Sequence, residues 1–360
     1  MDERTAWLTL SLWGSAAGRA VREALAHGVA PQDVVLARVR SSRLAAQLRK
    51  CPRVSVPDLL VQLEELGQVA ITPADHDWPR DRLAALGDPP PALYVRGTLP
   101  LVGPRAVGLV GTRAATPYGT DLARSFAQVL ATAGVDVVSG LALGVDGAAH
   151  RGALDAEGVT RAVVAGGLEH VYPPEHRALA LDVAKRGTLL GEAPPGTRPE
   201  RWRFVRRNRL VAALCDALVV IEAPLRSGAL ITARYAVEQG REVFAVPASV
   251  HQATSAGCLE LLRRGEAALA RSAGDVLEGL GWAGPAASDA RPLALPDAPV
   301  FEDPRHERLY RLLEGIEGAT DDELARRTGL PSHEVSALLT GWELEGRVER
   351  RPGLGVRRRR

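Results

Sequence analysis

The sequence predicts an α/β protein built around a Rossmann-like, doubly wound parallel sheet, flanked by an N-terminal helical SAM-like domain and a C-terminal winged-helix domain. Three observations predict this plan. Between residues 69 and 282, short apolar runs alternate with helical windows, which is the pattern of a sheet covered by helices on both faces. Residues 1–68 contain only short helical windows, and residues 303–360 read as three helices followed by a hairpin.

The N-terminal domain, residues 1–68, has two helical stretches around a glycine-containing turn, which is typical of a helix-hairpin-helix bundle. Within it, residues 38–53 carry six basic residues and no acidic one. Such a run predicts either a solvated face or a contact with a DNA backbone. The sequence leaves open whether this domain touches DNA or only braces the sheet.

The central domain, residues 69–282, contains the predicted sheet. Its strands are expected at Ala92–Val95, Ala106–Val110, Val135–Val138, Arg161–Val164, Leu189–Leu190, Ala217–Ile221 and Glu242–Val246. Helices are expected between them, at about 118–133, 144–157, 175–186 and 228–239. Right-handed crossovers make such a sheet doubly wound, and the carboxyl ends of its parallel strands then meet at the edge where ligands bind.

The last part of the chain is a linker followed by the winged-helix domain. Residues 283–302 are rich in Pro, Ala and Asp and read as the linker, and Thr320 with Glu323 forms a capping box in the domain that follows. Residues 303–346 hold five arginines against ten acidic residues, whereas residues 347–360 hold seven arginines against one glutamate. We therefore expect the helices to dock on protein and any DNA contact to come from the wing and the tail.

Composition restricts the class of protein further. With 46% hydrophobic and 24% charged residues, the chain can bury a core, and no apolar run approaches the roughly 18–20 residues that a bilayer requires. Cys51, Cys215 and Cys258 are odd in number and widely spaced, which does not support a disulfide framework. We expect a cytoplasmic protein.

Four loops after the predicted strands carry small or polar residues. They contain Gly111, Thr112 and Arg113; Ser139 and Gly140; Gly166 and Gly167; and Ser227 and Gly228. Glycines let an anion approach the backbone, and helix N-termini present free N–H groups to it. Together with the arginine, the four loops predict an anion pocket at the carboxyl edge of the sheet.

The segment 198–209, RPERWRFVRRNR, carries six arginines and one acidic residue, with two aromatic residues between them. Guanidinium groups beside aromatic rings are what a single-stranded nucleic acid requires, because charge follows its phosphates and rings stack on its bases. We expect a basic loop in which Arg206, Arg207 and Arg209 hold phosphates, as Arg113 does. Phe204 then stacks on a base or supports the loop, and Asn208 bonds a base edge or fixes the loop.

Several other chemistries lack their signatures. Gly108 and Gly111 do not continue into a GxGxxG dinucleotide motif, and neither a P-loop nor a GxSxG nucleophile elbow occurs. Asp146 and His150 lie one helical turn apart, a spacing more typical of a pair that bridges its own helix than of a catalytic or metal site. We therefore expect no catalytic residue, no metal site and no cofactor.

An ordered set of motifs resembles the DNA-processing protein A family (DprA, also called Smf). The motifs are VGTR at 110–113, SGLALGVDGAAH at 139–150, GGLEHVYPPEH at 166–176, GEAPPG at 191–196, FVRRNRLVAAL at 204–214, VIEAPLRSGALITA at 220–233 and GREVFAVP at 240–247. The three-part layout is also similar to that of the longer members. The chain departs from the family pattern at Pro247-Ala248, Gly257-Cys258-Leu259, Gly265-Glu266 and Gly191-Glu192.

The resemblance implies a non-catalytic protein that binds single-stranded DNA during natural transformation, or competence, protects the incoming strand and helps to load the RecA recombinase. It also implies a homodimer through the Rossmann-like domain and the absence of a metal or nucleotide cofactor. The family's DNA pocket maps onto Arg113, Ser139, Gly140, Gly166, Gly167 and the run from Phe204 to Arg209. The dimer geometry, the RecA surface and the choice between transformation and repair stay open.

Two other functions remain as alternatives. The first is an enzyme similar to the nucleoside monophosphate phosphoribohydrolases of the lysine-decarboxylase-like group, whose PGGxGTxxE motif falls near Ser227–Thr232; the second glycine pair and the closely following glutamate are absent here. The second alternative is a winged-helix regulator that binds duplex DNA, which the acidic recognition helix disfavours.

Overall fold

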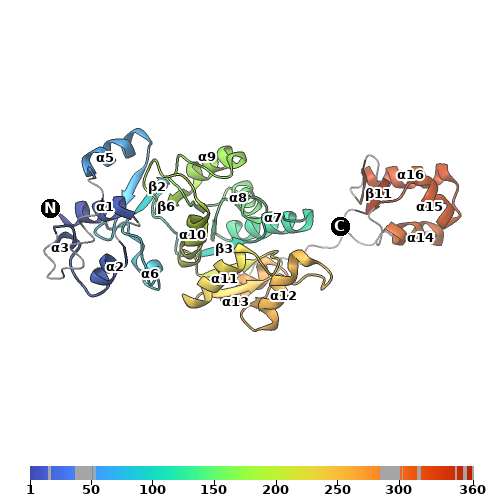
Figure 1. Cartoon of the computed structure of the whole chain (residues 1–360). Helices are drawn as coiled ribbons and strands as arrows, with labels where there is room; N and C mark the ends of the chain where they lie inside the picture. Colours follow the sequence, from blue (N-terminus) through green and yellow to red (C-terminus); the bar gives the residue numbers. More distant parts are fainter. Residues whose placement is uncertain are drawn as a thin grey trace. The chain divides into compact units, whose positions relative to one another are not determined.

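The computed structural model describes residues 1–14, 18–36, 51, 54–283, 301, 303–313, 318–344, 347–351 and 355–358. Their contacts divide the chain into two units, Met1–Pro292 and Leu293–Arg360. Figure 1 labels the elements of both. The basic run at 38–53 lies, except for Cys51, outside the described residues, as does most of the linker 283–302.

The first unit contains one sheet of nine strands (Figure 1). In spatial order the strands are β1 (Val69–Ile71), β2 (Leu93–Gly97), β6 (Thr188–Gly191), β5 (Thr160–Val163), β4 (Asp136–Ser139), β3 (Ala106–Val110), β7 (Ala217–Val220), β8 (Glu242–Ala245) and β9 (Ala268–Leu269). From β6 to β9 all neighbours pair in parallel, whereas β2 pairs antiparallel with β6 and β1 antiparallel with β2. The chain winds outward from β3 in both directions, which confirms the predicted doubly wound fold.

Helices cover both faces of this sheet because its strands are apolar on both sides. One face packs on α6 (Arg80–Leu83), α10 (Arg201–Ala213), α11 (Gly228–Glu238) and α12 (Ala256–Arg263). The other packs on α5 (Val56–Glu65), α7 (Pro117–Thr132), α8 (Val145–Asp155), α9 (Arg177–Arg186) and α13 (Ala273–Gly279). In β3, for example, Val110 joins the first cluster and Leu109 the second. This alternation is the pattern of a sheet buried on both sides.

The sequence led us to expect a loop at 198–209, but the structure has a helix there. Residues Arg201–Ala213 form α10, with Glu200 in extended conformation at the N-cap position. After Pro199 the segment contains no glycine or proline, and arginine, alanine and leucine are good helix formers. A helix sorts its arginines onto different sides, which changes what each of them can contact.

The N-terminal helices belong to the same unit as the sheet, and the first of them packs on it. They are α1 (Glu3–Trp13), α2 (Gly18–Ala26) and α3 (Pro31–Val35). Leu8 of α1 joins the core formed by α5 and by Tyr94 of β2, and the Ser11 and Tyr94 hydroxyls hydrogen-bond at 2.7 Å. The contacts therefore do not separate residues 1–68 from the sheet.

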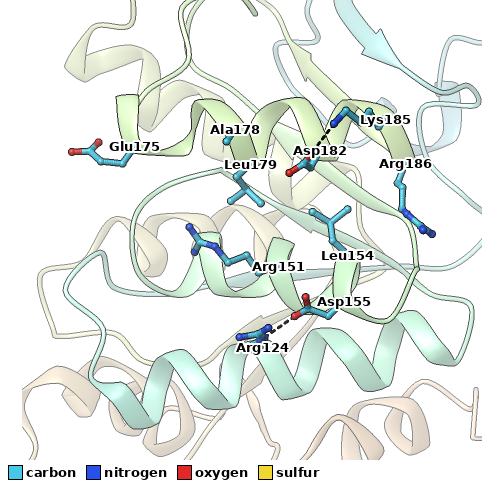
Figure 2. A pocket seen from close by; sticks show the side chains of 10 residues that line it. All are labelled: Arg124, Arg151, Leu154, Asp155, Glu175, Ala178, Leu179, Asp182, Lys185 and Arg186. Carbon is cyan, nitrogen blue, oxygen red and sulfur yellow. Dashed lines mark hydrogen bonds and ion pairs between the residues drawn. The ribbon is translucent and has the colours of Figure 1, made fainter.

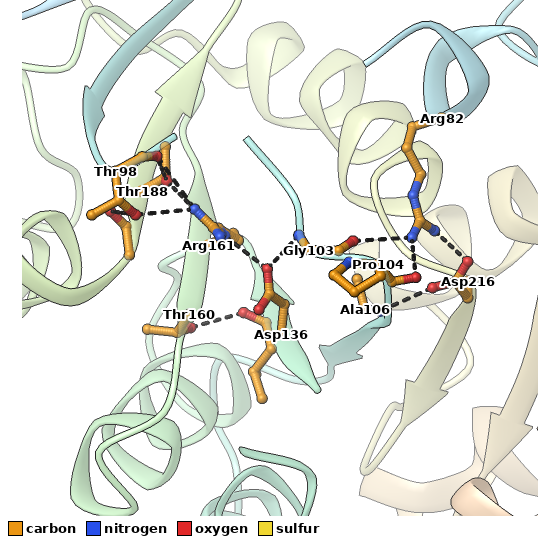
Figure 3. Close-up of polar contacts among 12 residues, drawn as sticks. Arg82, Thr98, Gly103, Pro104, Ala106, Asp136, Thr160, Arg161, Thr188 and Asp216 are labelled. Carbon is orange, nitrogen blue, oxygen red and sulfur yellow. Dashed lines mark hydrogen bonds and ion pairs between the residues drawn. The ribbon is translucent and has the colours of Figure 1, made fainter. Parts of the chain in front are cut away.

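Ion pairs secure the amino ends of the strands (Figure 3). Asp136 at the start of β4 accepts from Arg161 at 3.0 Å and from the backbone N–H of Gly103 at 2.7 Å. Arg82 of α6 binds the Asp216 carboxylate, which also accepts from the N–H of Ala106 at 2.9 Å. These contacts tie the connection between β2 and β3 to the amino edge and leave the carboxyl edge open for a site.

The second unit has the elements of a winged helix. They are α14 (Pro304–Leu312), α15 (Asp321–Thr328), α16 (Ser332–Leu344), β10 (Val348–Arg351) and β11 (Gly355–Arg358). The predicted cap at the start of α15 is present, because the Thr320 hydroxyl accepts from the N–H of Glu323 at 3.3 Å. In its core, Trp342 packs edge to face on both Phe301 and Tyr310, whose own rings are tilted by 48° to each other.

Candidate nucleic-acid interface

The loops that follow β3, β4 and β7 meet at the carboxyl edge of the sheet. The N–H of Thr112 donates to the Glu222 carbonyl at 2.6 Å, and the N–H of Val145 donates to the Thr112 carbonyl at 3.3 Å. A Cβ at Gly111 would press against Val145 and within 2.8 Å of the Glu222 carbonyl, so this position requires glycine. The predicted convergence of these loops is therefore present.

Arg113 is an exposed cation at this edge, and it lies over an aromatic ring. Its Cζ atom is 5.2 Å from the centroid of the Phe204 ring, the geometry of a cation–π contact. Phe204 in turn packs edge to face on Tyr172, with ring centroids 5.4 Å apart. Tyr172 was not predicted as a site residue, although it follows the glycines after β5. The three side chains come from β3–α7, α10 and β5–α9, and we call them the arginine–aromatic stack.

Arg207 forms the floor of the site rather than its surface. It is only 4% exposed, and its guanidinium donates to the Val163 carbonyl of β5. Burial lowers the pKa of Arg207 to about 10, against the opposing attraction of Asp146. A Cβ at Gly140 would collide with this guanidinium, which explains the glycine there.

Asp146 holds the turn after β4. Its carboxylate accepts from the N–H groups of Gly140 and Ala142 at 3.1 and 3.4 Å. Burial raises the pKa of the Asp146 carboxyl, while Arg207 and the two N–H donors oppose the shift. Leu141, between those donors, adopts a positive φ of 59°, and its carbonyl lies 2.9 Å from His176 Nδ1. The turn is thus fixed from two sides.

The other predicted glycines and Ser139 are structural supports of the edge. Ser139 is fully buried and donates to the Leu109 carbonyl at 2.6 Å. The N–H of Gly167 donates to the Thr197 carbonyl at 2.8 Å, and a Cβ at Gly166 would come within 2.9 Å of the same oxygen. These close approaches position the segment that leads into α10. Their predicted contact with DNA stays a prediction.

Arg206 and Arg209 do not join the arginine–aromatic stack. Both bind Glu192, Arg206 Nε at 3.0 Å and Arg209 Nη2 at 2.5 Å, and Arg206 also binds Asp88 at 3.0 Å. Arg209 is 7% exposed. Carboxylates pair with both guanidinium groups, so a phosphate would have to compete with Glu192 for either of them. Their expected contact with phosphates stays a prediction. The sequence pattern missed Glu192, which lies 14 and 17 residues away.

Asn208, Ser227 and Gly228 connect α10 to the start of α11. The Asn208 amide donates to the Gly228 carbonyl at 3.3 Å, and the Ser227 hydroxyl accepts from the N–H of Ala229 at 3.2 Å. Gly228 is exposed, and a Cβ there would meet nothing within 4 Å. This helix start is therefore open to solvent next to α10.

Glu222 fills the crevice between β3 and β7, where a doubly wound sheet usually binds a nucleotide. Its carboxylate accepts from the N–H of Thr116 at 2.9 Å, at the N-terminus of α7, and Glu222 is 3% exposed. The protein thus supplies its own anion at the helix start where a phosphate sits in dinucleotide-binding folds.

A separate groove of about 510 Å³ lies along α8 and α9 and contains none of the predicted site residues (Figure 2). Its cations are largely matched by acids: Arg124 binds Asp155 at 2.6 Å, and Lys185 binds Asp182 at 2.8 Å. A groove of such mixed charge does not favour a polyanion.

Two family models match this chain. The model of DNA recombination-mediator protein A matches residues 69–281, and that of the DprA winged helix domain matches residues 284–354. The chain belongs to the DNA processing protein A family. Protein Smf of Escherichia coli is 37% identical to it over 382 aligned residues, which cover 100% of this chain and 97% of the relative. These matches confirm the resemblance that the motifs indicated.

Solved structures of the family share the fold. DNA processing protein A from Streptococcus pneumoniae superposes with a TM-score of 0.65 at 29% identity, over 77% of this chain and 98% of that one. The Helicobacter pylori protein, described for its single-stranded DNA binding mode, superposes with a TM-score of 0.53 at 30% identity, over 59% and 95%.

The winged-helix domain of this family member has a wing whose charge is partly neutralised. Arg350 of β10 binds Asp321 at 3.1 Å and Glu343 at 3.4 Å. A phosphate would have to compete with both acids for this guanidinium. Arg359 and Arg360 of the tail lie outside the described residues. The DNA contact expected of the wing and the tail stays a prediction.

One group of side chains in the described part of the chain has the composition of a metal site. Asp303, His306 and Glu334 present ligand atoms within 4.8 Å of one another. The Asp303 carboxylate is already bonded to Arg305 at 2.6 Å, and His306 to Glu334 at 2.9 Å. Each group thus has a partner within the protein.

None of the helices described is long and apolar enough to cross a bilayer.

Proposed function

We propose that this protein binds single-stranded DNA at the carboxyl edge of its sheet, without catalysis, and helps to load a RecA recombinase on that strand during transformation or recombination. One observation carries the DNA-binding part: an exposed guanidinium, that of Arg113, lies on the Phe204–Tyr172 pair at the edge where this fold binds ligands. The cation meets a phosphate, and the rings offer faces to unpaired bases. The single-stranded DNA binding mode of the Helicobacter pylori relative supports the choice of a single strand.

The proposal of a non-catalytic role rests on the crevice between β3 and β7. Glu222 occupies the helix start that a nucleotide phosphate requires, and a second negative charge there would be repelled. The phosphoribohydrolase alternative therefore finds less support. Release of free base from a nucleoside monophosphate by the purified protein would restore it.

A dimer through the central domain is part of the proposal. Exposed apolar side chains occur at the β7–β9 end of the sheet, where Leu225 is 62%, Val250 78% and Leu269 51% exposed. Such side chains favour a protein contact. A mass measurement by light scattering tests it, and a monomer at micromolar concentration would refute it.

The DNA-binding part is tested by titrating fluorescent oligo-dT, and a duplex of equal length, against salt. Arg113→Ala should weaken single-strand binding and reduce the slope of log K against log salt by about 0.7, the value for one phosphate contact. Arg271→Ala removes a guanidinium that is 67% exposed and paired with Asp275, and serves as the matched control. Equal binding to duplex, or an unchanged slope in Arg113→Ala, would overturn the assignment.

RecA loading is tested on DNA coated with single-strand binding protein. The wild-type protein should shorten the lag before RecA hydrolyses ATP on that DNA, and Arg113→Ala should lengthen it again. A lag that the wild-type protein does not change would refute this part of the proposal alone.

A further inference from the structure

Trp202 lies in the first turn of α10 and is 46% exposed. Tryptophan is highly buried on average, and this one belongs to none of the hydrophobic clusters of the described residues. Its ring carries the Arg203 guanidinium, with Cζ 4.4 Å from the ring centroid, and its indole N–H donates to Glu200 at 2.5 Å. An exposed indole held in place by two charged neighbours suits contact with a ligand better than it suits packing.

Helix geometry places Trp202 on a different side of α10 from the arginine–aromatic stack. An α-helix turns 100° per residue, so the directions of Trp202 and Phe204 differ by about 160° around the helix axis. Phe204 faces Arg113, whereas Trp202 lies on the same side as Arg206, four residues further along. Two sides of the amino-terminal end of α10 thus each carry an aromatic ring in contact with a guanidinium: Phe204 with Arg113 on one, and Trp202 with Arg203 on the other.

Positive charge continues beyond Trp202. The side chain of Arg206 is 34% exposed and shares Asp88 with Arg22 of α2, whose Nε lies 3.6 Å from that carboxylate. Arg206 also binds Glu192, which it shares with Arg209, so three arginines on two acids leave a net positive charge. The half-exposed pairs with Asp88 are weak. A phosphate can compete for either guanidinium.

We propose that Trp202 and Arg203 form a second base-stacking site, which a single strand reaches by passing from Arg113 and Phe204 around the amino-terminal end of α10. The ligand is an unpaired nucleobase with its phosphodiester, and the next phosphates approach Arg206 and Arg22. The inference rests on the proposed function and deepens it, because it sets the length of strand that the protein engages.

Two physical properties of this site follow from its position. Stacking on an indole needs a base that is free of its partner strand, so the site favours single strands of any sequence. A strand must also span the width of a helix, about 10 Å with side chains, before a second base reaches Trp202. A short strand that fills only the first site therefore gains no affinity from Trp202.

The test compares the affinities of the full-length protein for fluorescent oligo-dT of about 6 and about 20 nucleotides, one near the lower end of the usual occupancy of a binding groove and one above its upper end. Trp202→Ala should lower the affinity for the longer strand by about 5- to 150-fold, the effect of losing one base–aromatic stack, and change the affinity for the shorter strand by less than about 2-fold. Trp202→Phe keeps a ring and should retain most of the affinity. Val205→Ala removes a neighbouring exposed side chain without a ring, 44% exposed, and controls for general effects on α10.

Intrinsic fluorescence provides a second readout. The longer strand should quench the wild-type emission more than the shorter strand does, and Trp202→Phe should abolish that difference. Unchanged affinity of Trp202→Ala for the longer strand would overturn the inference while leaving the proposed function intact. Equal losses for both strands would overturn the proposed path, since Trp202 would then belong to the first site. Failure of the wild type to bind either strand would overturn the proposed function itself.

Discussion

We predict that the protein loses stability in mild acid because of the surroundings of His150. It lies in α8, fully buried, and its Nδ1 is 2.7 Å from the Thr160 hydroxyl. That hydroxyl donates its own proton to the Val137 carbonyl at 2.8 Å, so it accepts from Nδ1–H and leaves Nε2 as the unprotonated nitrogen. Nε2 has no hydrogen-bond partner among the described residues. Protonation would therefore create an unpaired buried charge, close to the positive charges of Arg207 and Arg151.

The magnitude follows from the pKa. Burial, assisted by His176 and these arginines, lowers the pKa of His150 from 6.5 to about 3. In this range the unfolded chain binds a proton that the folded chain does not, so stability is fully present above the unfolded pKa and is lost as the pH falls towards the folded one. Of the interval between pH 7.5 and pH 5, about 1.5 pH units lie below the pKa of histidine in the unfolded chain. Over these units the free energy of unfolding should fall by about 2 kcal/mol.

The assay is urea unfolding at these two pH values, followed by far-ultraviolet circular dichroism, for the wild type and His150→Gln. Glutamine cannot take up the proton. The unfolding free energy of the variant should therefore fall by about 2 kcal/mol less than that of the wild type over the same pH interval. Comparing the two changes removes any constant cost of the substitution itself. Equal losses in both proteins would refute the assignment of the pH dependence to His150.

Two further predictions concern the floor and the flank of the site. Gly140→Ala should displace the Arg207 guanidinium, cost about 1–3 kcal/mol by overpacking and weaken single-strand binding, as urea unfolding and an oligo-dT titration would show; unchanged stability would contradict the close approach. Glu192→Gln should cost about 2–4 kcal/mol in unfolding free energy, because Arg209, with 8% of its side chain exposed, would keep a buried charge without its carboxylate. A loss below about 0.5 kcal/mol, the usual range for surface substitutions, would show that water compensates for the carboxylate.

The sequence by itself determined the central sheet and the edge at which the site lies. Strands β3 and β7 coincide with their predicted apolar runs to within one residue, because a sheet buried on both faces needs continuous apolar segments. Glycines such as Gly111 and Gly140 marked the carboxyl edge, because close backbone approach excludes a Cβ.

The tertiary structure alone decided what each arginine does. The run at 198–209 is one helix, and helical periodicity directs Arg207 into the floor and Arg209 towards Glu192. Charge and composition are the same for a loop and a helix, so the pattern could not separate buried cations from exposed ones. Tyr172 was likewise invisible as a partner of Phe204, because contacts between residues 32 positions apart depend on how strands and helices pack.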